Sequence, residues 1–283
     1  MSYERRASPL HAARAAVGAT WCLVLVVAAC LIRHPLVLAG LLGIVLLAAG
    51  GAGVGRVVAR WLPWSLAFGA AIAFVNALAS RDGLTTLARL GTVPGWGPVD
   101  ITGEALAWGG VLALRAVVVL CGARLFSAAV DPDQLLRAFR RISFHSAVTA
   151  SVATRMIPVL ARDGKRLALA ARARGVAPSR LALMRAVTGN ALDRSLDAAA
   201  TLEVRGYGSA RRAPRMVAPW SRHDLAFAAS AFALLVVAVL ARGWAGFEPY
   251  PRIETGLGAG VWGAILALAV VALLPFADRR GLG

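Results

Sequence analysis

Two related runs decide how this chain is organised: LARDGKRLALAARARG at residues 160–175 and LDRSLDAAATLEVRGYG at residues 192–208. Each run predicts a helix with an arginine in its last turn and a glycine immediately after it, Gly175 in the first and Gly206 in the second. Glycine readily adopts the left-handed conformation that commonly ends a helix. Both runs lie in an arginine-rich polar block, residues 131–222, with apolar segments on either side. The pattern indicates an interaction surface carried on a membrane anchor, without a recognisable catalytic centre.

The composition favours a membrane protein over a soluble one. The chain of 283 residues is 59% hydrophobic and has a mean hydropathy of +0.69, whereas soluble domains are about 45–50% apolar. A net charge of +17 would suggest nucleic-acid binding on a soluble fold. Here the basic residues alternate with long apolar runs, so membrane topology explains them better and we expect no nucleic-acid partner. Cys22, Cys30 and Cys121 lie in apolar runs without CxxC or metal-ligand spacing, so we expect no disulfide, metal or cofactor.

Six apolar segments approach the ~20 residues that cross a bilayer core of ~30 Å. They cover about residues 15–32, 36–53, 62–80, 104–130, 225–244 and 256–276. We therefore predict an all-α fold, a polytopic membrane helical bundle with a cytoplasmic pair of amphipathic helices. Its three sections are residues 1–130 with four spans, residues 131–222 with the polar block, and residues 223–283 with two spans.

Some stretches depart from this simple pattern. Residues 81–103 are rich in Gly, Pro and Thr and predict an irregular exposed loop. Phe144–Leu160 is too polar for a clear span, and the sequence leaves open whether it lies along the membrane surface or enters the bundle. Polar side chains within spans are costly in lipid, so we expect Arg115, Arg124 and Asn76 to face the bundle interior or an interface. Arg124 lies near the end of its span and is expected to snorkel to the membrane surface.

Basic residues predict the orientation. With both termini in the cytoplasm, the inside segments hold most of the 31 Lys and Arg residues, and the polar block alone holds more than half. The outside loops then hold few: Arg33, Arg81, Arg89, Arg242 and Arg252. Because short cytoplasmic loops carry the excess of Lys and Arg, we predict six spans with both termini cytoplasmic.

The polar block predicts its own helices. Asp131-Pro132-Asp133 is typical of a helix start. Near one face of a helix over residues 158–174 lie Leu160, Leu167, Ala171 and Arg174, with Pro178 beyond its end. Near one face of a helix over residues 192–205 lie Arg194, Ala198, Thr201 and Arg205, with Gly206 and Gly208 beyond its end. Between the two helices we expect a core that includes Leu160, Leu167, Leu192 and Leu196. An arginine at a helix end interacts favourably with the helix dipole, so an arginine-glycine end is common without any further function.

The order of these elements resembles the transmembrane T component of energy-coupling factor (ECF) transporters, the family that includes the cobalt-transport permease protein. The residues that carry the resemblance are Ser8-Pro9, Asp131-Pro132-Asp133-Gln-Leu-Leu, Arg155-Met-Ile-Pro158, Ala173-Arg174-Gly175 and Glu203-Val-Arg-Gly-Tyr-Gly208. One departure is Val204, at a position where the family usually has alanine.

The resemblance implies a non-catalytic subunit of an ATP-driven importer in a bacterial or archaeal plasma membrane. In that family two coupling helices contact two cytosolic ABC ATPase subunits and hold a small membrane protein, the S component, which binds a vitamin or a transition-metal ion. Part of the apolar faces that carry Leu160, Leu167, Leu192 and Leu196 would then be a platform for the S component instead of a core between the helices. The implied ATPase-binding residues are Ala173, Arg174, Gly175, Val204, Arg205 and Gly206. A guanidinium stays charged and forms a bidentate pair with a carboxylate. The chain has no GxxxxGK[ST] run, in line with a subunit that does not itself bind nucleotide.

Two other functions are compatible with the residues. A membrane-anchored basic scaffold would bind anionic lipid or nucleic acid through the polar block. A membrane-embedded lipid-modifying enzyme would need clustered carboxylates to hold metal ions, and Asp193 and Asp197 are the close acidic pair on a helix of the block.

Overall fold

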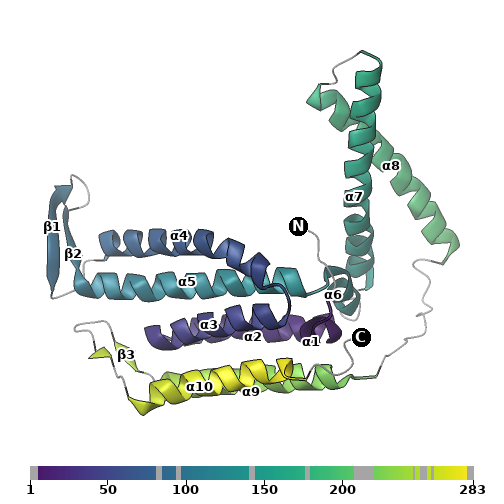
Figure 1. Cartoon of the computed structure of the whole chain (residues 1–283). Coiled ribbons are helices and arrows are strands. Elements are labelled where there is room, and N and C mark those ends of the chain that lie inside the picture. Colours follow the sequence, from purple (N-terminus) through teal and green to yellow (C-terminus); the bar gives the residue numbers. More distant parts are fainter. Residues whose placement is uncertain are drawn as a thin grey trace. The chain divides into compact units, whose positions relative to one another are not determined.

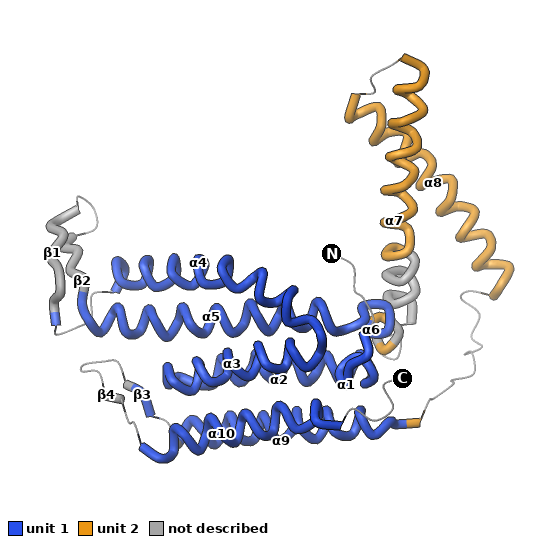
Figure 2. Tube along the Cα trace, in the orientation of Figure 1, with its two compact units in different colours: residues 1–135, 220–283 blue, residues 136–219 orange. Residues whose placement is uncertain are grey.

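The computed structural model describes residues 6–80, 85–93, 97–139, 144–175, 179–206, 219–244, 246–248, 254–255 and 258–278. Over these residues the fold is helical apart from two short hairpins (Figure 1), and the predicted all-α class is confirmed. The chain forms two compact units (Figure 2): unit 1 is Met1–Leu135 with Trp220–Gly283, and unit 2 is Leu136–Pro219. The three-section division of the sequence stays a prediction, and its first and third sections both contribute to unit 1.

Unit 1 is a bundle of antiparallel helices. Its helices are α1 (Pro9–Ala12), α2 (Ala15–Leu31), α3 (Pro35–Gly51), α4 (Gly55–Ala79), α5 (Gly103–Ala129), α9 (Arg222–Trp244) and α10 (Ala259–Leu273), followed by the 3-10 turn Leu274–Phe276. Helix α2 packs against α5 and α9, α5 lies along α3 and α4, and α10 lies beside α9 and α3 (Figure 1). Helix α1 begins at Ser8-Pro9, where the Ser8 side chain accepts a hydrogen bond from the His11 backbone N–H.

The apolar segments predicted from the sequence all form helices in unit 1. Four helices of the described chain are long and apolar enough to cross a membrane: α4, α5, Arg222–Gly243 of α9 and Ala259–Phe276. Helices α2 and α3 are shorter, with 17 residues each. Such a helix is about 25 Å long, at the lower end of what spans a bilayer core. The protein is therefore a membrane protein built as a helical bundle.

Aromatic packing and one hydrogen-bond chain hold α2, α9 and α10 together. Trp21 is fully buried and meets Phe227 and Phe276 edge-to-face, with ring centroids 5.5 and 5.6 Å away. The Trp21 indole N–H donates to the Ser230 hydroxyl over 3.0 Å, and that hydroxyl donates to the Val271 carbonyl over 2.8 Å. The Trp21 indole N–H and the Ser230 hydroxyl are therefore both hydrogen-bonded, as their apolar surroundings require.

Glycines bring α4 and α5 into close contact. A Cβ atom on Gly69 would lie 3.0 Å from the Ala113 carbonyl oxygen, and one on Gly109 would lie 3.0 Å from the Ala73 carbonyl oxygen. These distances are too short for most real Cβ contacts, so the small residues set how closely the two backbones approach.

The loop prediction for residues 81–103 is wrong over the described part. Strand β1 (Thr86–Val93) pairs with β2 (Gly97–Thr102) in an antiparallel hairpin, with shifts in register along it. The hairpin is joined to α5 by Glu104, whose carboxylate accepts hydrogen bonds from the Thr85 backbone N–H and hydroxyl. The β-branched threonines and valines of both runs favour strands, and the Gly and Pro residues between them obscured this in the sequence. A second, shorter hairpin joins β3 (Phe247–Glu248) to β4 (Glu254–Thr255).

The polar block opens with α6 (Pro132–Phe139) and continues as two long helices in unit 2, α7 (Phe144–Ala173) and α8 (Arg180–Val204). The predicted start at Asp131 is confirmed, because its carboxylate accepts from the backbone N–H groups of Asp133 and Gln134. Phe144–Leu160 is not a separate segment: it is the first half of the continuous 30-residue α7, with Pro158 inside the helix. Helix α7 is not among the helices of the described chain that are apolar enough to span a membrane.

One face of α7 packs against one face of α8. Half-buried residues recur at intervals of three, four or seven positions, which keeps them on one face of each helix: Met156, Leu160, Gly164, Leu167 and Ala171 on α7, and Leu183, Val187, Ala191, Ala198 and Leu202 on α8. The predicted core holds for Leu160 and Leu167. It is wrong for Leu192 and Leu196, which are 62% and 70% exposed, because a helix turns about 100° per residue and so points them away from Val187 and Ala191.

Candidate functional site

The first candidate site is the C-terminal end of α7. Ala173 is its last residue, and the Arg174 backbone N–H still bonds the carbonyls of Ala170 and Ala171 at 3.3 and 3.1 Å. The Gly175 N–H donates to the Arg172 carbonyl over 2.9 Å, and Gly175 has a φ of +75°. A side chain is strained at such a φ, so glycine is required for the chain to leave the helix in this direction. Pro178, which the sequence places beyond this end, lies outside the described residues.

The end of α8 repeats this geometry. Val204 is the last helical residue, and the Arg205 N–H donates to the Thr201 carbonyl over 3.2 Å. The Gly206 N–H donates to the Glu203 carbonyl over 2.9 Å, and its φ is +77°. The predicted left-handed glycine ends are therefore confirmed for both helices. Tyr207 and Gly208, the remainder of the second motif, lie outside the described residues.

All six residues predicted to bind a partner are exposed: Ala173, Arg174, Gly175, Val204, Arg205 and Gly206. Val204, the departure from the family pattern, is 90% exposed. Its extra bulk therefore meets no neighbouring helix within the described chain. An apolar side chain this exposed gains no burial from the fold itself, which leaves it available for contact with another molecule.

The two ends lie far apart on the same helix pair. Because α7 ends close to where α8 begins, Arg174 lies beside the N-terminal end of α8 and Arg205 lies at its C-terminal end (Figure 1). Helix α8 has 25 residues and so is about 37 Å long. Each arginine thus lies at the C-terminal end of its own helix. The two arginines are therefore separated by about the length of α8.

An ion pair joins the two helices between these ends. Arg194 of α8 approaches the Asp163 carboxylate of α7 to 2.9 Å, with side-chain exposures of 44% and 11%. Beside it, a Cβ on Gly164 would lie 3.7 Å from a methyl group of Val187, so the backbones are close here. The sequence-based interpretation missed this pairing. Its one signal is that Asp163 is the only acidic residue of the strongly basic α7.

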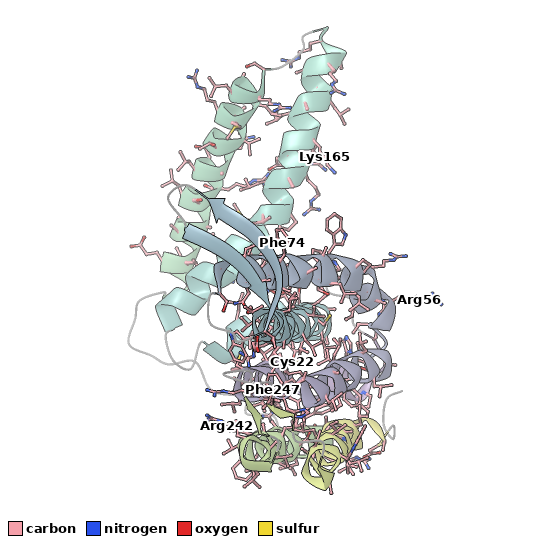
Figure 3. All side chains as sticks on the ribbon, turned by 90° about the vertical axis from the view of Figure 1, so that its left-hand side faces the viewer. Cys22, Arg56, Phe74, Lys165, Arg242 and Phe247 are labelled. Carbon is pink, nitrogen blue, oxygen red and sulfur yellow. The ribbon has the colours of Figure 1, made fainter. Side chains whose placement is uncertain are left out.

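Unit 2 is predominantly basic on its surface. Exposed cations of the described residues are Arg155, Arg162, Lys165, Arg166, Arg172, Arg174, Arg180, Arg185, Arg194 and Arg205, and Lys165 projects from α7 (Figure 3). The acidic pair Asp193 and Asp197 is also exposed on α8. This field would steer an acidic partner towards the two helix ends.

The arginine in the middle of α5 has structural partners within the bundle. Arg115 lies near the middle of α5 and donates to the carbonyls of Ala29 and Ile32 at 3.1 and 2.9 Å. It therefore caps the end of α2, whose last carbonyls have no partner within their own helix. Phe247 of β3 lies edge-to-face with the buried His34 next to this turn. The prediction that Arg115 faces the bundle is confirmed.

Comparison with known proteins agrees with this architecture. A protein-family model described as "Cobalt transport protein" matches residues 6–216, which include both helix ends. The "Energy-coupling factor transporter transmembrane protein EcfT" of Thermosediminibacter oceani is 29% identical over 140 residues, which are 42% of this chain. The chain thus matches about half of that relative, 53% of its length. From the extent of the family match, the chain belongs to the cobalt transport protein family, whose members are membrane components of transporters.

Proposed function

We propose that this protein is the transmembrane coupling subunit, the T component, of an energy-coupling factor ABC-type importer. It passes the ATP-driven motion of two cytosolic ABC ATPase subunits to a small membrane S component, for uptake of a vitamin or a transition-metal ion. The observation that carries the proposal is the pair of equivalent, exposed arginine-glycine ends on α7 and α8. The name of the Thermosediminibacter relative, an energy-coupling factor transporter transmembrane protein, supports it.

Each helix end would bind one ATPase. The three residues Ala173, Arg174 and Gly175 form one contact, and Val204, Arg205 and Gly206 form the other. A helix end with a terminal arginine fits a groove that has carboxylates at its base, because a bidentate guanidinium–carboxylate pair is both strong and directional. Two contacts separated by the length of α8 suit two ATPase subunits better than one, since a single small groove would not reach both.

The pair of helices α7 and α8 would then transmit the motion of the ATPases. The Asp163–Arg194 ion pair and the close approach at Gly164 tie α7 to α8, so a displacement at either end is passed to the other helix. One side of α8 exposes the apolar side chains Leu181, Met184, Leu192 and Leu196, with Arg185 among them. On this proposal it is the platform that contacts the S component, and substrate specificity belongs to that subunit.

The proposed orientation puts both termini and unit 2 in the cytoplasm. The positive-inside rule favours it, and the ATPases that unit 2 would meet are cytosolic. A plasma membrane of a bacterium or an archaeon is the expected location.

The test is purification of the tagged full-length protein from its native membranes, with ATPase subunits and ATPase activity measured in the eluate. The double variant Arg174→Glu, Arg205→Glu is expected to lose the ATPases almost entirely, because it places like charges opposite acidic grooves. The matched control is Arg166→Glu, Arg185→Glu, which changes the net charge equally at exposed positions within the same two helices. It is expected to retain the ATPases.

Equal retention by both double variants would mean that the helix ends are ordinary caps, and the proposed function would fail. Equal loss of ATPase from both would mean that only the general positive charge of unit 2 matters. The basic scaffold would be favoured instead if the wild type itself retained no ATPase.

A further inference from the structure

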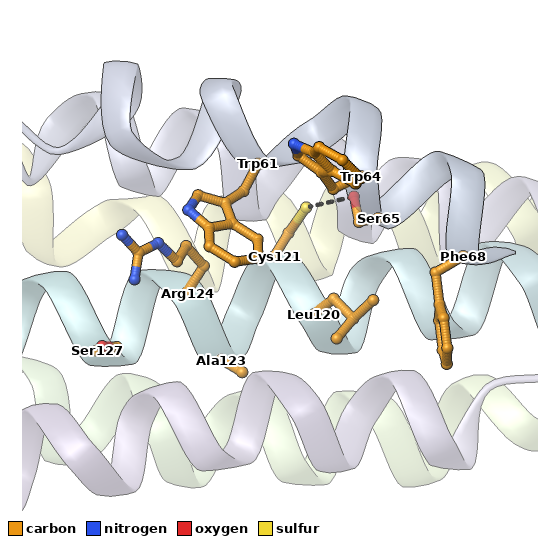
Figure 4. Close-up of a pocket in the computed structure, with 9 residues that line it drawn as sticks. All are labelled: Trp61, Trp64, Ser65, Phe68, Leu120, Cys121, Ala123, Arg124 and Ser127. Atoms are coloured by element: carbon orange, nitrogen blue, oxygen red, sulfur yellow. Dashed lines mark hydrogen bonds between the residues drawn. The ribbon is translucent and has the colours of Figure 1, made fainter. Parts of the chain in front are cut away.

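An open groove runs between α4 and α5 in unit 1 (Figure 4). Its volume is about 450 Å³. Its walls are aromatic and aliphatic side chains, chiefly Trp61, Trp64 and Phe68 of α4 and Leu120 of α5. The Ser65 hydroxyl and the Cys121 thiol meet over 3.7 Å between the two helices. The groove is thus almost wholly apolar along its length.

The groove opens towards the exterior of the helical bundle. Trp61 is 47%, Trp64 73% and Phe68 55% exposed. Helix α4 is the least buried of the four helices that are long and apolar enough to span a membrane. The groove therefore faces the space that a bilayer fills.

One end of the groove is cationic. The Arg124 guanidinium lies over the Trp61 ring, 5.1 Å from its centroid, and none of the residues that line the groove is acidic. Arg60 is exposed and lies one helical turn before Trp64 on α4, and the exposed Arg56 lies one turn further (Figure 3). Arg124 is five residues from the end of α5. The positive charge is therefore concentrated where both helices reach the membrane surface, at the level where tryptophan is typically found.

We propose that this groove binds a phospholipid with an anionic headgroup. The phosphate contacts Arg124, through the charge-assisted hydrogen bonds that guanidinium forms with phosphate. One acyl chain lies along Trp64, Phe68 and Leu120. This arrangement offsets the cost of a cation close to hydrocarbon and covers aromatic surface that the bundle leaves open. It requires only that the helices lie in a membrane, so it does not depend on the proposed function.

The size of the groove favours a lipid chain over a helix of another protein. Trp61 and Phe68 are seven residues apart, which is about 10 Å along the helix. A helix about 10–12 Å across fills roughly 800–1,100 Å³ over that length. That is about twice the volume of the groove, so a helix could lie only across its opening, with side chains inserted. A single extended chain is narrow enough to enter it.

The first experiment measures lipid retained by the purified full-length chain. The protein is extracted in detergent micelles that contain either phosphatidylglycerol or phosphatidylcholine, and bound lipid is counted by native mass spectrometry. Wild type is expected to retain phosphatidylglycerol preferentially. Loss of a charge-assisted contact weakens binding by about tenfold or more, so Arg124→Gln should lose most of this preference. Arg124→Lys should keep part of it.

Two controls keep the result interpretable. Arg242→Gln removes an exposed arginine near the opposite end of the bundle, on a helix that does not line the groove, and should leave the preference unchanged. Ala123→Trp fills the groove from an exposed position and should displace the lipid while Arg124 remains. Equal retention of both lipids by wild type, or an unchanged preference in Arg124→Gln, would overturn the proposal.

A photoreactive residue at position 123, irradiated in native membranes, identifies the occupant directly. An adduct with the mass of a phospholipid on the 29.4 kDa chain supports the lipid site. A cross-link to another polypeptide overturns it and assigns the groove to a protein partner.

Discussion

The two units of this protein use their apolar residues in opposite ways. In unit 1, α2 buries seven of its 17 residues, among them Trp21 and Leu25 with no exposed surface. In unit 2, α8 has no buried residue along its 25 positions, and four of its large apolar side chains are exposed, Leu181, Met184, Leu192 and Leu196. Unit 1 is thus stabilised by its own packing. Unit 2 leaves both helix ends and several large apolar side chains of α8 exposed.

Truncation of one large side chain in each unit tests this contrast most directly. Trp21→Ala removes the centre of the aromatic cluster and should cost about 3–5 kcal/mol of stability. Leu196→Ala removes a side chain that is 70% exposed and should change stability by less than about 0.5 kcal/mol. Thermal unfolding of the detergent-solubilised protein measures both. Comparable losses would mean that α8 is covered within the isolated chain.

A second comparison concerns one carboxylate in each unit. Asp224 is almost fully buried, pairs with Arg14 over 3.2 Å, and accepts from the backbone N–H groups of Arg14 and Ser221. Asp163 has its ion pair with the half-exposed Arg194. Asp224→Ala leaves buried donors unsatisfied and should cost about 3 kcal/mol. Asp163→Ala should cost about 1 kcal/mol.

The readout for this comparison is again thermal unfolding, with ATPase retention measured beside it. Asp163→Ala should lower the thermal midpoint only slightly. It should lower the amount of ATPase retained clearly, because the ion pair ties α7 to α8. A larger stability loss for Asp163→Ala than for Asp224→Ala would contradict the ranking.

The left-handed glycines are expected to affect stability only locally, at the helix ends. Gly175→Ala and Gly206→Ala each place a side chain at positive φ, which costs about 1–2 kcal/mol locally and frays only the helix end. Gly189→Ala lies within α8 with nothing near its Cβ, and should stabilise the helix by up to about 1 kcal/mol. The thermal midpoint should barely move for Gly175→Ala and Gly206→Ala, while ATPase retention falls. Unchanged ATPase retention in both variants would show that ATPase binding does not require the left-handed backbone at the helix ends.

Features that depend on local sequence could be predicted. Apolar run length indicated the membrane helices, and arginine-glycine spacing indicated both left-handed helix ends. Sequence reasoning could not find Asp163–Arg194 or Arg14–Asp224, because such pairs depend on how distant helices cross. It also misplaced Leu192 and Leu196, since one helix can carry apolar residues on two faces and only packing decides which is buried. Whether the six residues of the two ends bind ATPases stays a prediction.

The cap that Arg115 provides also has a consequence for biosynthesis. The carbonyl of Ile32 lies 83 residues before Arg115 in the chain, and synthesis at about 5–20 residues per second separates the two by roughly 4–17 seconds. During that interval the carbonyls of Ala29 and Ile32, at the end of α2, lack the Arg115 side chain as a partner. The end of α2 therefore gains this cap only after Arg115 of α5, the fourth apolar helix, has been made, so the order of translation imposes an order on this step of membrane assembly.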